Sequence, residues 1–83
     1  MRMKKYLKFY APWCCQCKQM NKILENTGLP VDSINVDENE ELTEKFHIRS
    51  LPTVVLVEDD KEICRFTGLT TETKLKEAYA GNN

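Results

Sequence analysis

The sequence lacks long hydrophobic runs, is sparing in glycine and proline, and carries almost no net charge. No apolar stretch in the 83 residues approaches the roughly 18 residues that a membrane-spanning helix needs. Three Gly and three Pro exclude collagen-like and low-complexity chains. Twelve basic against 13 acidic side chains leave no broad basic face for nucleic acid. With 41% hydrophobic and 30% charged residues, the chain is expected to fold as one domain spanning residues 1–83.

The N-terminal stretch lacks the features of a secretory signal. Residues 1–5 are basic, but the segment that follows contains Lys8 and no sustained apolar run, which a signal peptide requires. We therefore expect a cytoplasmic protein. In a reducing compartment, clustered cysteines indicate redox chemistry or metal binding rather than structural bridges. Three of the four cysteines lie within four positions.

Hydrophobic periodicity and turn residues predict seven secondary-structure elements. Strands are expected at 4–11, 31–36, 53–57 and 62–67, and helices at 14–26, 39–46 and 70–80. Gly28 should end the first helix and Thr70 should cap the last one. The order β-α-β-α-β-β-α predicts an α/β fold with a mixed four-stranded sheet. Its first strand–helix–strand unit should be a right-handed parallel crossover, and its last two strands an antiparallel hairpin.

Cys14 and Cys17 form a Cys-x-x-Cys pair where the first strand passes into the first helix. The free N–H groups and the positive dipole end of a helix start favour thiolate over thiol at the first cysteine. The second cysteine, three residues on, returns to the same side and can close a disulfide. Zinc sites use the same spacing but need a second ligand pair, for which only Cys64 and His47 are available. Redox chemistry is favoured, and zinc or copper(I) binding stays an alternative.

The other singular residues have simpler interpretations. Cys15 is expected to be an exposed bystander on the outer face of the helix, with regulatory oxidation or metal coordination as alternatives. Cys64 is expected to be a small core residue. His47 should adopt a left-handed conformation at the end of the second helix. Trp13 is either an exposed contact residue or core filling.

Two separated segments resemble signatures of the thioredoxin family. Residues 11–18 (APWCCQCK) are similar to its active-site segment, in which an aromatic residue precedes the Cys-x-x-Cys and a lysine follows. Residues 48–53 (IRSLPT) resemble the segment in which a cis-proline faces the cysteine pair. Residues 35–37 and 66–69 match in order and spacing. The resemblance covers residues 4–80 and implies a compact thioredoxin fold without the usual leading strand and helix, as in small phage and archaeal thioredoxins.

This resemblance implies a dithiol–disulfide oxidoreductase that reduces protein disulfides. Cys14 would be the nucleophile and Cys17 the resolving thiol. The residues expected to bind substrate are Trp13, Leu51, Pro52 and Gly68.

The resemblance also implies that the chain needs no cofactor and no metal. Its partners would be disulfide-containing proteins, such as ribonucleotide reductase, and a thioredoxin reductase or glutathione system as electron donor. We expect a monomer. A glutaredoxin-like, glutathione-dependent enzyme is the nearest alternative, but Gly68 is followed by Leu69 rather than by the Gly-Gly and acidic pattern that glutaredoxins use. A thioredoxin-fold interaction domain without turnover is a third class.

The chain departs from the family at positions expected to tune its redox properties: Lys8, Cys15 and Gln16. Lys8 stands where thioredoxins carry a buried aspartate, and Ser33 stands where its partner lysine is usual. Cys15 and Gln16 replace the familiar Gly-Pro or Pro-Tyr pair. An ammonium near the cysteines would stabilise their thiolates and make the couple more oxidising than thioredoxin. The alternative is that Lys8 extends past the sheet into water.

Overall fold

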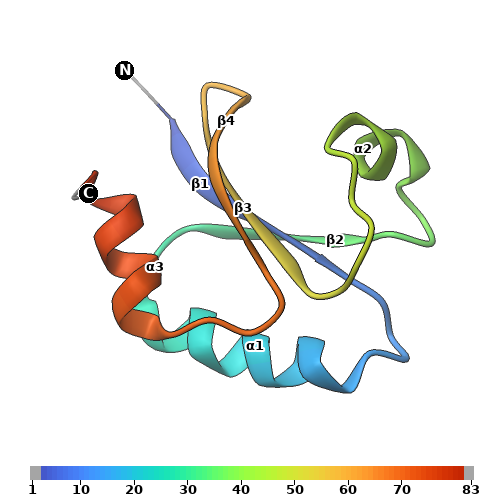
Figure 1. Cartoon of the computed structure of the whole chain (residues 1–83), viewed down its shortest axis with the longest axis horizontal. Coiled ribbons are helices and arrows are strands. Elements are labelled where there is room, and N and C mark those ends of the chain that lie inside the picture. The colour runs from blue at the N-terminus through green and yellow to red at the C-terminus, as the bar shows by residue number, and fades with distance from the viewer. Residues whose placement is uncertain (1–2, 82–83) are drawn as a thin grey trace.

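A computed structural model describes residues 3–81, which form a sheet with helices on both faces (Figure 1). The strands are β1 (Lys4–Tyr10), β2 (Val31–Asn35), β3 (Thr53–Glu58) and β4 (Lys61–Thr67), and the helices are α1 (Cys15–Thr27), α2 (Glu40–Lys45) and α3 (Glu72–Tyr79). All seven predicted elements are present in the predicted order, and no end differs from its prediction by more than two residues. Met1 and Arg2, at the start of the basic N-terminal stretch, lie outside the described residues.

The helix ends follow local capping chemistry. Gly28 ends α1 in the left-handed conformation, with φ 70°, as its position predicts. The prediction that Thr70 caps the last helix is wrong: α3 begins at Glu72, and Thr71 Oγ1 accepts a hydrogen bond from Lys74 N at 3.2 Å. Thr71 is the N-cap because a capping residue has to stand directly before the first helical residue.

The strands form one sheet in the order β2-β1-β3-β4. β1 pairs with β2 in parallel and with β3 antiparallel, and β3 and β4 form an antiparallel hairpin. This arrangement confirms the predicted parallel crossover and hairpin. β3 is buried at every position from Thr53 to Val57, because it is central and covered on both faces.

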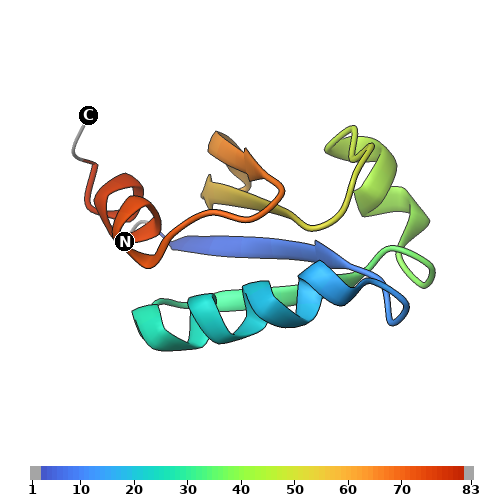
Figure 2. The same ribbon diagram turned by 60° about the horizontal axis from the view of Figure 1, so that its bottom comes forward.

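The two faces of the sheet build separate cores. α1 and α3 cover one face and α2 lies against the other (Figure 1, Figure 2). Along β1, Tyr6 packs in the α1–α3 core, whereas Leu7 and Phe9 pack in the core beneath α2. This alternation follows from the two-residue period of a strand. It directs Lys8, an even-numbered position, toward α1.

Within residues 3–81, no helix is both long and apolar enough to cross a membrane.

Candidate active site

The junction between β1 and α1 places Cys14 at the helix start. Cys14 N donates to Ala11 O at 3.1 Å, which closes a turn after the strand. Cys14 is the N-cap of α1, and its Sγ accepts a hydrogen bond from Cys17 N at 3.2 Å. The first turn of α1 holds no acidic side chain, so nothing offsets the positive end of the helix dipole there.

Cys14 and Cys17 are joined by a disulfide, with their Cα atoms 5.3 Å apart. The pairing confirms that the three-residue spacing brings the two thiols together. Cys14 is 8% exposed and Cys17 only 2%, so the first cysteine is the more accessible of the pair. Cys15 is free and exposed, and Gln16 is exposed as well, as expected for the outer face of the helix.

The segment before β3 carries the proline of the second motif. The Leu51–Pro52 peptide bond is cis and Pro52 is buried. Gly68 N donates to Pro52 O at 2.8 Å, and Thr53 Oγ1 donates to Ser50 O at 2.7 Å. The structure thus ties Gly68, at the end of β4, directly to Pro52.

Trp13 and Leu51 line one shallow groove beside the cysteines. The groove holds about 280 Å³, and its other lining residues are Val36, Thr43, Ile48, Arg49 and Ser50. Trp13 is 70% exposed, so it lies at the surface and does not fill the core. An exposed indole above an apolar groove suits an extended polypeptide, because it supplies contact area at low conformational cost.

The fourth cysteine lies apart from this site. Cys64 pairs with Leu56 across the β3–β4 hairpin and packs against the core beneath α1 and α3. Burial raises the pKa of its thiol, which disfavours reactivity. His47 has φ 53°, the left-handed conformation predicted for it. The side chains of residues 3–81 form no group of three or more histidines, cysteines or carboxylates suited to a metal ion.

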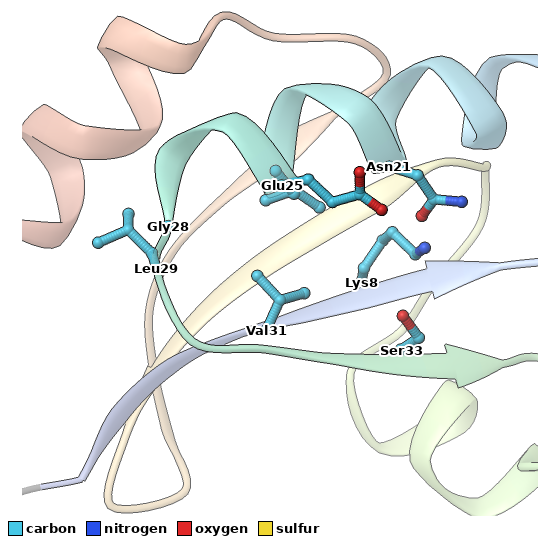
Figure 3. A pocket seen from close by; sticks show the side chains of 8 residues that line it. Lys8, Asn21, Glu25, Gly28, Leu29, Val31 and Ser33 are labelled. Atoms are coloured by element: carbon cyan, nitrogen blue, oxygen red, sulfur yellow. The ribbon is translucent and has the colours of Figure 1, made fainter.

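Lys8 is buried between the sheet and α1. Its side chain is 4% exposed and reaches from β1 toward the helix, with Ser33 beside it on β2 (Figure 3). The even positions of β1 face α1, so the helix covers the stem of Lys8 and the ammonium borders a hollow beside it. Burial lowers the pKa of the Lys8 ammonium, and the charge of Glu25 opposes that effect.

Sequence reasoning missed two polar residues that share this space. Asn21 and Glu25, on α1, line the same hollow as Lys8 and Ser33 (Figure 3). A signal was present in the sequence: both follow Cys17 at steps of four residues, which puts them along one side of a helix.

Comparison with known proteins agrees with this geometry. The family model for thioredoxin matches residues 3–80. The chain belongs to the thioredoxin family. It is 39% identical over 66 residues to thioredoxin of Chlamydia pneumoniae, covering 74% of this chain and 65% of that protein. It is 37% identical over 68 residues to thioredoxin-1 of Drosophila melanogaster, covering 75% and 64%.

Solved thioredoxin structures share the fold. A mutant thioredoxin from Halobacterium salinarum superposes with a TM-score of 0.86 at 30% identity, covering 94% of this chain and 73% of that one. The germline-specific thioredoxin Deadhead of Drosophila melanogaster gives 0.80 at 34% identity, covering 94% and 79%. The chain spans 64–65% of the length of the two curated relatives described above.

Proposed function

We propose that this protein is a dithiol–disulfide oxidoreductase that reduces disulfides in client proteins. The observation that carries the proposal is the Cys14–Cys17 disulfide at the start of α1. A reversible disulfide there combines a nucleophile at the positive end of a helix with a resolving thiol within bonding reach.

In the first step, the Cys14 thiolate attacks one sulfur of the client disulfide. A Cys14–client bond forms, the client S–S bond breaks, and the released client sulfur takes up a proton. In the second step, the Cys17 thiolate attacks Cys14 Sγ, and the second client sulfur leaves and is protonated. The client gains two electrons and two protons, and the protein returns to the disulfide form.

The groove lined by Trp13 and Leu51 is the proposed client-binding surface. Leu51 precedes the first paired residue of β3, so an extended client segment can approach its backbone. Next to Leu51 in the chain, Pro52 accepts a 2.8 Å hydrogen bond from Gly68 N. Gly68 has φ 84°, a conformation that favours glycine.

The proposal has four finer parts. The protein is cytoplasmic and monomeric, its clients include ribonucleotide reductase, and a thioredoxin reductase supplies its electrons. The Gly68-Leu69 sequence supports a thioredoxin-type donor over glutathione. Zinc or copper(I) binding has weaker support, since Cys15 is exposed and Cys64 is partly buried against the core beneath α1 and α3.

Insulin reduction tests the activity. The protein with dithiothreitol should precipitate insulin much faster than dithiothreitol alone. Cys14→Ser and Cys17→Ser should each abolish the acceleration, and Cys15→Ser is the matched control that should retain most of it. Replacing dithiothreitol by NADPH with thioredoxin reductase, or by glutathione with its reductase, identifies the donor. An inactive wild-type protein would contradict the proposal and leave an interaction domain.

A further inference from the structure

Lys8 is a largely buried residue whose ammonium makes no ion pair within residues 3–81. Lys8 and Thr53 are the buried polar side chains of residues 3–81. The Thr53 hydroxyl donates to Ser50 O, whereas in this part of the chain Lys8 Nζ has no hydrogen bond and no carboxylate within 4.0 Å. Its specific contact is with the ring of Tyr10, 4.8 Å from Nζ to the centroid. Within residues 3–81 no fully buried side-chain nitrogen or oxygen lacks a hydrogen-bond partner, so the stem of Lys8 is covered while its ammonium keeps contact with solvent in the space beside it.

The ammonium points into a hollow between α1 and the strands β1 and β2. The hollow holds about 340 Å³, and its polar lining consists of Lys8, Asn21, Glu25 and Ser33 (Figure 3). Glu25 is exposed, so water screens its charge. The positive charge of Lys8 is therefore not neutralised within the hollow.

The Lys8 side chain leans toward the cysteine end of α1. Its Nζ lies over Tyr10, the last residue of β1 before the loop to Cys14, and beneath Asn21 (Figure 3). Asn21 is one helical turn after Cys17, so the two side chains stand about 5–6 Å apart at Cβ. Cys17, at 2% exposure, shares the buried side of the helix.

We propose that Lys8 is an electrostatic positioning residue of the Cys14–Cys17 couple, whose ammonium stabilises the Cys17 thiolate and hence the reduced form. The proposal rests on the redox function proposed above. When two glutathione thiols reduce the disulfide, the S–S bond breaks and the two protein sulfurs accept two electrons. Glutathione disulfide forms, and solvent takes the protons that the two protein sulfurs do not bind. The reduced pair then carries negative charge that the Lys8 ammonium stabilises.

Few other ionisable groups face this ammonium. On α1 the charge that acts on it is that of Glu25, and on β1 its neighbour is the ring of Tyr10. The residues paired with Lys8 are Ser33 on β2 and Val54 on β3, and neither titrates. A positive charge beside a protein surface, where the effective dielectric constant is below that of bulk water, acts on a nearby thiolate more strongly than the same charge in water. A couple with a stabilised reduced form is the more oxidising one.

The test is equilibration with glutathione buffers at pH 7, with the reduced fraction read by thiol alkylation and mass spectrometry. Lys8→Met keeps the length and apolar stem but removes the charge. It should shift the equilibrium toward the disulfide form by about tenfold, which is about 30 mV for a two-electron couple. Lys8→Arg should stay close to wild type. Lys5→Met is the matched control: Lys5 pairs with Asp32 at 2.7 Å on the opposite face of β1, and its loss should change the equilibrium less than twofold.

A pH titration of thiolate absorbance in the reduced protein is a second readout that a merely structural role would not move. Lys8→Met should move the Cys17 titration to higher pH, and Lys8→Arg should restore it. Should Lys8→Met equilibrate within twofold of wild type, or shift the equilibrium without moving the titration, the proposal is overturned. Lys8→Gln repeats the test if the methionine variant does not fold. A wild-type protein that does not exchange electrons with glutathione would overturn the proposed redox function. That outcome differs from a failure of the Lys8 proposal alone, in which wild type and Lys8→Met both exchange and reach the same equilibrium.

Discussion

The backbone N–H of Cys17 donates a hydrogen bond to Sγ of Cys14, 3.2 Å away. Cys14 thus occupies the N-cap position that serine, threonine or aspartate fills at other helices. A thiolate in that position accepts the bond more strongly than a neutral thiol, because hydrogen bonds to ionised acceptors are about twice as strong. We therefore expect the contact that caps the helix to favour the Cys14 thiolate in the reduced protein.

We expect iodoacetamide to alkylate Cys14 at least about tenfold faster than Cys17 or Cys64 at neutral pH. Cys14 combines the helix-start environment with partial exposure, whereas Cys17 is covered and burial raises the pKa of Cys64. The reduced Cys15→Ser protein is the substrate, since the exposed Cys15 would otherwise compete. Peptide mass spectrometry over time measures the order, and faster labelling of Cys64 would contradict the assignment of the nucleophile.

Trp13→Ala should weaken client binding without weakening the fold. Trp13 is 70% exposed and lines the groove, so its loss removes client contact and little internal packing. We expect KM for insulin to rise several-fold, with the free energy of unfolding within about 0.5 kcal/mol of wild type. Met3→Ala is the matched control, because Met3 is also 70% exposed but lies beside Asp59 at the far end of β1. An equal rise in KM for both variants would contradict a specific role for Trp13.

Tyr6→Phe should lower the free energy of unfolding at neutral pH. It should also make the free energy of unfolding fall less steeply as the pH rises above about 10. The Tyr6 hydroxyl is buried and donates to Leu75 O at 2.6 Å, which is worth about 1 kcal/mol. Burial raises the pKa of this phenol in the folded protein, while in the unfolded chain it ionises near pH 10. Its contribution is thus complete below about pH 10 and falls above it.

Urea denaturation between pH 7 and pH 11 measures both effects of the Tyr6 substitution. Wild type should lose stability more steeply than Tyr6→Phe above about pH 10. Parallel curves for the two proteins would show that Tyr6 keeps its ordinary titration in the folded state.

Lys8→Met should make the protein more stable at pH 7, by about 1–2 kcal/mol, because it removes a desolvated charge. Burial lowers the pKa of Lys8 below its ordinary 10.5, so the penalty is complete below that lowered value. The destabilisation shrinks as the pH rises from that lowered pKa toward 10.5. In this range the unfolded chain binds more protons than the folded one, so rising pH favours the folded state. The stability difference between the two proteins should therefore narrow in alkali.

Lys5→Met serves again as the control for stability. Lys5 is partly exposed and paired with Asp32, so its loss should change the free energy of unfolding by less than about 1 kcal/mol. A Lys8→Met protein that is less stable than wild type would mean that Lys8 supports the fold by contacts beyond its charge.

Local sequence signals account for the elements and for the cysteine pair. The alternating and helical apolar patterns placed all seven elements, and the three-residue spacing at a helix start brought Cys14 and Cys17 together. These features depend on neighbours within a few residues, so they can be read without the rest of the chain. The cap of α3 at Thr71 shows the limit of such reading, because Thr70 and Thr71 are equally good capping residues and only the helix start distinguishes them.

Tertiary structure decided what local patterns leave open, and Lys8 is the clearest case. The sequence allowed its side chain either to approach the cysteines or to reach water. The packing of α1 over the even positions of β1 buried it, and its place beneath Asn21 depends on how the helix crosses the sheet. In the same way, the groove between Trp13 and Leu51 joins segments about forty residues apart. Burial and juxtaposition of this kind arise from contacts between distant parts of the chain, which no local pattern encodes.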